Sequence, residues 1–296
     1  MPLSSAGHAA REQRLSAVHI EPLSATMGAE VQGVDLARPI DDDTFAAVRA
    51  AFHRHLMLRF AAQRLNEAEQ IAFSRRFGEL QVHVLDQYRH PQHPEIYVLS
   101  NVDRETGRTI GHHPDKGTLA WHSDLSFQRR PALATILYGI ETPSVGGETQ
   151  FADMIAAYDA LDAAMKRRID GLRAVHDLDV SRARMGEPPM TPEQRQKAPP
   201  VSHPVVRTHP DTGRKGLFVS GHVAHVEGLP ASESEALMAQ LMEHATSPRF
   251  VYSYRWRQRD VVMWDNRCTM HRATAYDTSA ERRVIHRTVV LGDVPC

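Results

Sequence analysis

Three His-x-Asp triplets stand out, because a histidine nitrogen and a carboxylate two residues apart on a strand can bind one metal ion from the same face. They are His113-Pro114-Asp115, His122-Ser123-Asp124 and His209-Pro210-Asp211. The central proline and the glycine that follows predict turns for the first and third triplets. The second lies in LAWHSDLSF (119–127), where bulky apolar residues alternate with polar ones. This alternation predicts a strand whose polar face lines a cavity; the alternative is a face exposed to solvent.

One more imidazole would complete a facial triad of two histidines and a carboxylate, which leaves open positions for chemistry on non-haem iron. The candidates are His53, His83, His176, His203, His222, His225, His271 and His286. His271 has the most distinctive context, since a buried apolar run and a polar turn precede it. His222 and His225 have a spacing that could serve a structural zinc site, but no cysteine lies near them in the sequence and the chain has no HExxH motif.

Arg283 and Arg287 are four residues apart next to or within an expected strand at 284–291, so their side chains project from the same face. Two guanidinium groups that face an interior each need an anion, and arginine is suited to bidentate binding of carboxylates or sulfonates. The pair therefore predicts a site for two acidic ligands. The alternative is an edge strand whose arginines pair with surface acids.

The elements that must position these residues are mostly strands. We expect strands at 96–100, 119–127, 133–140, 148–152, 205–208, 217–220, 250–256, 260–264 and 284–291. Helices are expected after the caps Asp41 and Asn66, at about 153–172 and at 231–246. Many short strands with a few helices predict a mainly β fold, a double-stranded β-helix (jelly-roll) barrel with flanking α-helices.

The length of 296 residues is compatible with one large domain at 17–296, preceded by a flexible tail at 1–16. The segments 83–119 and 181–202 are long, polar and rich in proline or glycine. We expect these two segments to form mobile lids over the metal.

Charge and composition exclude several classes of function. The 35 lysines and arginines balance 36 acidic residues, which argues against nucleic acid as the main partner. No apolar run approaches the roughly 18 residues of a membrane span, and the first residues lack the apolar core of a signal peptide. We therefore expect a cytoplasmic protein with no membrane partner. Its two cysteines do not suggest a disulfide framework.

Five segments together resemble the TauD/TfdA family of iron(II)- and 2-oxoglutarate-dependent dioxygenases. They are WHSDLSF (121–127), PSVGGETQFADM (143–154), HPVVRTHPDTGRKGLFV (203–219), VMWDNRCTMHRA (262–273) and RRVIHRTVVLGD (282–293). The resemblance implies an enzyme whose cofactor is Fe(II) and whose co-substrates are 2-oxoglutarate and O2. It also implies a homo-oligomer, a dimer or a tetramer.

The same resemblance implies roles for particular residues. His122, Asp124 and His271 resemble the iron ligands of the family. Thr149 and Arg283 resemble the groups that bind the far carboxylate of 2-oxoglutarate.

Two further residues resemble the family's substrate contacts. Arg287 resembles the group that binds the acid group of the substrate, and His83 stands in the place of a histidine that contacts the substrate. The substrate implied is a small organic anion that is hydroxylated at a C–H next to its acid group.

The segments GHVAHVEGLP (221–230) and FVYSYRW (250–256) are similar to the aryloxyacetate-degrading branch, which favours an aryloxyalkanoate-type carboxylate. Alkyl sulfonates or sulfate esters are the alternative. Against taurine itself, Asp86 stands where a tyrosine is expected, and an insertion at 107–119 displaces an asparagine before His122. Alternatives of another class are a non-catalytic barrel that binds a small anion and a zinc hydrolase on the same scaffold.

Overall fold

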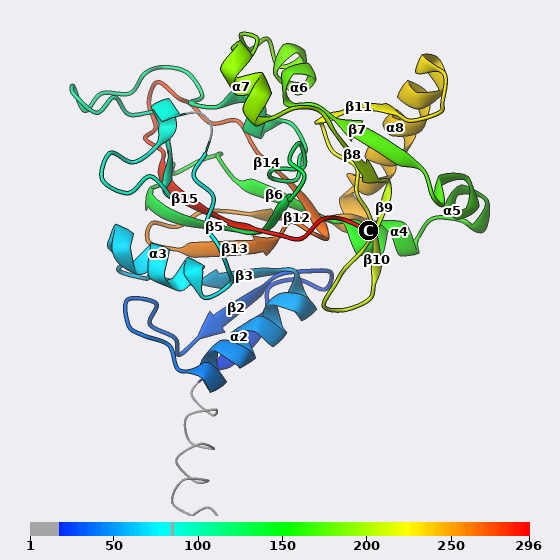
Figure 1. Cartoon of the computed structure of the whole chain (residues 1–296). Coiled ribbons are helices and arrows are strands. Elements are labelled where there is room, and N and C mark those ends of the chain that lie inside the picture. The colour runs from blue at the N-terminus through cyan, green and yellow to red at the C-terminus, as the bar shows by residue number, and fades with distance from the viewer. Residues whose placement is uncertain (1–17, 84–85) are drawn as a thin grey trace, which may run out of the picture.

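The computed structural model describes residues 18–83 and 86–296, so the predicted tail at 1–16 lies outside the described residues. The described chain forms four sheets with helices around them (Figure 1). Within the largest sheet, β2 and β3 pair in parallel and the other neighbours are antiparallel. Its seven strands are, in order, β1 (His19–Pro22), β2 (Ala29–Gln32), β3 (Met57–Phe60), β13 (Val261–Asp265), β5 (Ala132–Glu141), β15 (Val284–Leu291) and β4 (Tyr97–Ser100).

Three smaller sheets complete the described strands. The first has the order β12 (Val251–Tyr254), β6 (Thr149–Asp153) and β14 (Thr269–Ala273); the second has β11 (Val223–Val226), β7 (Arg173–His176) and β8 (Val201–Pro204); and the third pairs β10 (Lys215–Leu217) with β9 (Val206–Thr208). The described residues are therefore a mixed α/β structure with several sheets.

Two helices near the N-terminus pack on the seven-stranded sheet (Figure 1). They are α2 (Asp42–His55) and α3 (Glu67–Arg75). Asp41 and Asn66 cap them as the sequence predicts, because each side chain accepts a hydrogen bond from a backbone N–H in the first turn. Phe52 and Phe73 project from these helices into the core against strands β3, β5 and β13.

The other helices lie in the second half of the chain. They are α4 (Met154–Asp159), α5 (Ala163–Ile169), α6 (Leu178–Arg184), α7 (Pro192–Lys197) and α8 (Ala231–Ala245), with 3₁₀ helices η1 (Asp86–Tyr88), η2 (Lys116–Leu119) and η3 (Pro248–Phe250). The single helix predicted at 153–172 is two helices, because the Asp162 side chain caps α5. The structure contains, among its described residues, no helix long and apolar enough to cross a membrane.

The prediction of a strand at 119–127 is wrong. Only His122 pairs with a neighbouring strand, through an isolated bridge to His271, and the residues after it form turns. Leu125 adopts a left-handed conformation with φ of 56°. Asn266 holds this segment instead of a β ladder, since it accepts hydrogen bonds from the Ser123 hydroxyl (2.8 Å) and the Asp124 backbone N–H (3.0 Å).

The segment 181–202, which is expected to form a mobile lid, contains most of α6 and all of α7. Asp177 caps α6, and Thr191 forms a capping box with Gln194 at the start of α7. The expected lid at 83–119 likewise includes η1, β4 and η2. The lid role of both segments stays a prediction.

Two buried histidines predict that acid destabilises the fold. Burial lowers the pKa of both His203 and His286 to about 4, while the unfolded chain protonates near 6.5. Because the unfolded chain then binds more protons, the free energy of unfolding falls as the pH drops from 6.5 towards 4, by about 1.4 kcal/mol per pH unit for each histidine. Urea denaturation at pH 7, 6 and 5 checks this. His286→Gln is expected to flatten the dependence, and an unchanged slope in that variant would contradict it.

Candidate metal and anion site

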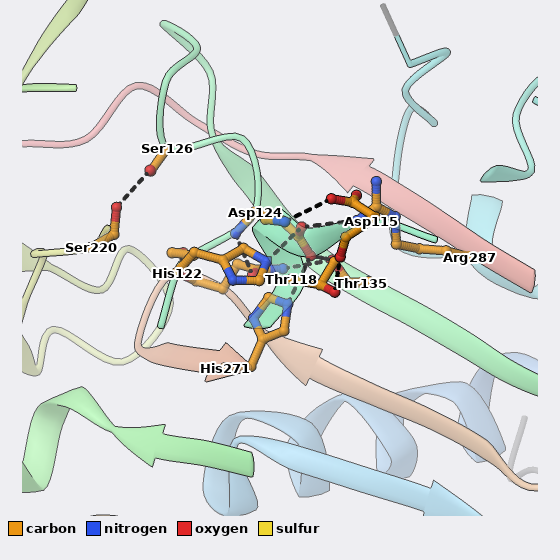
Figure 2. Close-up of polar contacts among 12 residues, drawn as sticks. Asp115, Thr118, His122, Asp124, Ser126, Thr135, Ser220, His271 and Arg287 are labelled. Atoms are coloured by element: carbon orange, nitrogen blue, oxygen red, sulfur yellow. Dashed lines mark hydrogen bonds and ion pairs between the residues drawn. The ribbon is translucent and has the colours of Figure 1, made fainter. Parts of the chain in front are cut away.

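The structure brings together the three residues that the sequence predicts as metal ligands. His122 and His271 exchange two backbone hydrogen bonds of 3.0 and 2.8 Å, and Asp124 follows in the next turn. Asp124 Oδ1 lies 3.8 Å from Nε2 of His122, and its Oδ2 lies 3.5 Å from Nε2 of His271. Figure 2 shows both imidazoles directed at this carboxylate. One ligand atom from each residue lies within 4.8 Å of the others, and all three side chains are buried.

The protonation of these groups fits a divalent cation. The His122 Nδ1 lies 2.8 Å from the Ala120 carbonyl, which makes Nδ1 the donor and leaves the Nε2 lone pair facing Asp124. Burial lowers the pKa of His271 well below its usual value. Burial alone would raise the pKa of Asp124, but the charge of Arg287 beside it helps to bring it well below its usual range. A carboxylate and two imidazoles are a donor set that iron or zinc takes.

The Thr135 hydroxyl holds the Asp124 carboxylate in place. Thr135 Oγ1 donates a hydrogen bond of 2.6 Å to Asp124 Oδ2, and Asn266 Nδ2 in turn donates to Thr135 Oγ1 at 2.9 Å. Such outer partners hold a metal ligand in one orientation.

The two arginines lie along one cavity beside this cluster, which Thr149 and His271 also line. Arg283 immediately precedes β15, and a register shift follows it between Val284 and Ile285. Both guanidinium groups are buried, as the sequence predicts. The alternative of an edge strand with surface ion pairs is therefore wrong.

Arg283 lacks a counter-ion, because no ion pair joins it to a carboxylate among the described residues. Burial lowers the pKa of Arg283 to about 10, so it is still charged at neutral pH. Nearby, Trp256 Nε1 donates to the Thr149 hydroxyl at 3.0 Å, which leaves the hydroxyl hydrogen available to a ligand. These two side chains suit a carboxylate that enters from outside.

Arg287 has a different environment. Its Nη1 lies 3.3 Å from Asp124 Oδ1, and its guanidinium carbon lies 4.2 Å from the centre of the Tyr97 ring. Figure 2 shows the side chain reaching the metal-type cluster from β15. Arg287 therefore contacts both that cluster and the larger pocket next to it.

The larger pocket opens over the cluster and combines apolar walls with charged groups. Its lining includes Leu125, Phe127, Leu178, Met185, Arg182, Arg184, Glu187, His83 and His222. His83 packs against the Tyr97 ring, with 4.8 Å between ring centres, and burial with Arg287 nearby lowers the pKa of His83 to about 3. The sequence does not predict that residues of α6 line this pocket, because this short helix shows no apolar periodicity.

His222 belongs to this pocket and not to a zinc site. Its Nδ1 lies 2.9 Å from the Ser126 hydroxyl, and its ring contacts those of His122 and Phe127. Within the described ranges, no metal-type cluster contains His222 or His225. The other candidate imidazoles, at 53, 176, 203 and 286, also lie outside the His122 cluster.

A second buried group of metal-type residues, His209, Asp265 and Cys268, is occupied by protein contacts. Arg267 donates to both carboxylate oxygens of Asp265, at 2.9 and 2.7 Å, and His209 Nε2 lies 3.0 Å from one of them. This network fixes the turn between β13 and β14, and hence the strand that carries His271.

Asp265→Ala is expected to destabilise the protein by roughly 3–5 kcal/mol, because it leaves the Arg267 charge buried with its main partner removed. Guanidinium denaturation measures this loss. Asp170→Ala, at an exposed carboxylate, serves as the control. A free energy of unfolding within about 1 kcal/mol of the wild type would contradict the structural role.

Comparisons with known proteins agree with this geometry. Residues 19–289 match the profile described as "Taurine catabolism dioxygenase TauD, TfdA family". The alpha-ketoglutarate-dependent 2,4-dichlorophenoxyacetate dioxygenase of Cupriavidus pinatubonensis is 39% identical over 92% of this chain and 97% of its own. The (S)-phenoxypropionate/alpha-ketoglutarate-dioxygenase of Sphingobium herbicidovorans is 36% identical over 94% and 96%. The crystal structure of AAD-2 in complex with Mn(II) and N-oxalylglycine matches with a TM-score of 0.81 and 35% identity, over 94% of this chain and 98% of that one.

Proposed function

Since the chain belongs to the taurine catabolism dioxygenase TauD, TfdA family, we propose that its buried His-Asp-His cluster holds iron(II) and that the adjoining pocket takes an aryloxyalkanoate-type carboxylate. The protein is an alpha-ketoglutarate-dependent dioxygenase, alpha-ketoglutarate being another name for 2-oxoglutarate. The observation that supports the site best is the convergence of two imidazoles and one carboxylate beside two buried arginines.

His122, Asp124 and His271 are the proposed metal ligands. Hydrogen bonds hold two of them in place without a metal: Ala120 accepts one from His122, Thr135 donates one to the Asp124 carboxylate, and Asn266 accepts one from the Asp124 backbone N–H. When bound, the iron and 2-oxoglutarate supply O2 activation, which converts 2-oxoglutarate to succinate and CO2 and hydroxylates a substrate C–H bond.

Thr149 and Arg283 are the proposed contacts of the far carboxylate of 2-oxoglutarate. The buried guanidinium without a carboxylate partner and the free hydroxyl hydrogen support this role. The charge of Arg283 would then be neutralised only when the co-substrate is bound.

Arg287 is the proposed contact of the substrate carboxylate, because it lies between the metal-type cluster and the larger pocket. An acid group held there would present its neighbouring carbon to the metal. The apolar side chains of Leu125, Phe127 and Leu178 would cover the aromatic ring, with His83 and His222 at the polar side. Hydroxylation next to the ether oxygen gives an unstable product that releases a phenol.

The proposed function also includes a jelly-roll arrangement of the sheets. We infer that the seven-stranded sheet and the β12–β6–β14 sheet are the two halves of a double-stranded β-helix, with the metal between β14 and the segment before β5. The single domain at 17–296 and the dimer or tetramer stay predictions.

The test is anaerobic addition of iron(II) and 2-oxoglutarate, followed by O2 and a panel of aryloxyalkanoates, alkyl sulfonates and alkyl sulfate esters, with succinate as the readout. We expect an aryloxyalkanoate to raise succinate formation most. If a sulfonate or a sulfate ester raised succinate formation more, the proposed substrate class would be wrong and the proposed reaction would stand. Activity without O2 or 2-oxoglutarate would instead favour a hydrolase, and no succinate with any compound would favour a binding protein.

A further inference from the structure

We infer that His113 and Tyr276 are further binding residues for the far carboxylate of 2-oxoglutarate, and this inference rests on the proposed position of that carboxylate beside Arg283. His113 belongs to the His-Pro-Asp triplet that the sequence predicts as a turn, within the 107–119 insertion. In the structure the triplet lies outside the strands, with a bend at Pro114, and the imidazole lies next to Tyr276.

Three buried side-chain atoms near Arg283 have no hydrogen-bond partner among the described residues. They are Nε of Arg283 itself, Oη of Tyr276 and Nε2 of His113. Buried polar atoms are normally partnered, because a buried atom left without a partner costs about 1–3 kcal/mol. Three such atoms on neighbouring residues indicate a ligand that accepts hydrogen bonds from them.

Tyr276 adjoins His113 through its ring, and Tyr276 and Arg283 both lie against Gly147. The rings of His113 and Tyr276 meet edge to face, with 5.9 Å between their centres. A Cβ placed on Gly147 would lie 3.5 Å from both Tyr276 Cδ1 and Arg283 Cδ, and 2.7 Å from Pro143 Cγ. Gly147 also has a φ of +68°, which L side chains rarely adopt. The backbone conformation and Pro143 therefore require glycine at this position, against which Tyr276 and Arg283 both pack.

The protonation of His113 makes its free nitrogen a donor. The Asp115 backbone N–H donates to His113 Nδ1 at 3.3 Å, so the proton of the neutral ring is on Nε2. Burial, and then the Arg283 charge, lowers the pKa of His113 to about 4, so the ring is neutral at pH 7.

Tyr276 is also a donor. Burial raises the pKa of its hydroxyl, so the hydroxyl keeps its hydrogen at neutral pH. The group around Arg283 thus presents N–H and O–H bonds. A carboxylate is the complementary ligand, because its two oxygens accept up to about four hydrogen bonds.

Contacts of the neighbouring Asp115 hold the His113 turn in place. Asp115 accepts hydrogen bonds from the Tyr97 hydroxyl (3.0 Å) and from the backbone N–H of Gly117 (3.0 Å). Figure 2 shows Asp115 and Thr118 on the same side of the cluster as Arg287. His113 is therefore fixed by its own segment, without using its Nε2.

The test measures binding of N-oxalylglycine, a 2-oxoglutarate analogue with both carboxylates, to the Mn(II)-loaded protein by calorimetry. His113→Ala and Tyr276→Phe are each expected to weaken binding about tenfold, as expected for a hydrogen bond to a charged group. His112→Ala, at the exposed neighbour, is the matched control and should bind as the wild type does. Pyruvate, which has the oxo acid end but no second carboxylate, should bind all four proteins equally.

Arg283→Gln separates the failure of this inference from that of the proposed site. If Arg283→Gln binds N-oxalylglycine normally, the proposed carboxylate position itself is wrong. If Arg283→Gln binds weakly while His113→Ala and Tyr276→Phe bind normally, only the present inference is overturned. If His113→Ala and Tyr276→Phe bound pyruvate as weakly as they bind N-oxalylglycine, the two residues would have a structural role, and the present inference would also be overturned. Tyr276→Phe removes one oxygen atom and decides the result if His113→Ala does not fold.

Discussion

Asp124→Ala is expected to lower 2-oxoglutarate-dependent succinate formation more than 100-fold. The substitution removes the carboxylate that faces both His122 and His271 and leaves two imidazoles to hold the metal. Replacing an outer partner of a metal ligand typically costs 10–100-fold in metal affinity or activity, so loss of a ligand should cost more.

Thr135→Val provides a graded comparison, because Thr135 is not a proposed metal ligand and acts through its hydrogen bond to Asp124. We expect this variant to lose about 10–100-fold in iron(II) affinity. Anaerobic iron(II) titration and succinate formation are the measurements, with the exposed Asp170→Ala as a control that retains both. Full turnover by Asp124→Ala would rule out the proposed iron site.

Arg287→Leu is expected to weaken substrate binding by about two to three powers of ten. A buried charged group that loses its partner costs roughly 3–5 kcal/mol, and the substrate carboxylate would lose its arginine. The KM for the substrate found in the panel should rise, while the affinity for N-oxalylglycine should change only a few-fold. Arg287→Lys keeps the charge without the planar guanidinium, so its KM should lie between those of the wild type and Arg287→Leu.

Arg283→Gln has the opposite pattern in the same assays. It is expected to weaken the binding of N-oxalylglycine and to leave the affinity for substrate less affected, because the proposed function assigns the two guanidinium groups to different acids. A normal KM in Arg287→Leu would place the substrate carboxylate elsewhere in the pocket.

The central strands were predictable from the sequence because they are rich in β-branched and other apolar residues. β5, β13 and β15 lie within one residue of the predicted ranges, and all three sit in the middle of the largest sheet. Helices α6 and α7 were missed, since six or seven residues span less than two turns and show no periodicity. The capping box of Thr191 and Gln194 is the one local sequence pattern that indicates the start of α7.

At the site, the sequence predicts residues that converge in the structure, but it predicts them from an incorrect local structure. His122 and Asp124 were expected to share the face of a strand, but a turn brings them together. Hydrogen bonds that the turn donates to Asn266, which lies far along the chain, stabilise it. A contact of this kind depends on the tertiary fold and leaves no trace in local spacing. The pairing of Tyr276 with His113 is non-local in the same way.

The 3.3 Å contact between Arg287 and Asp124 has a thermodynamic consequence. A substrate anion that draws Arg287 away from Asp124 changes the affinity of that carboxylate for a cation. By linkage, a cation at Asp124 changes the affinity of Arg287 for the anion by the same factor. The order of addition therefore alters each apparent affinity, while the product of the two affinities is the same along either order.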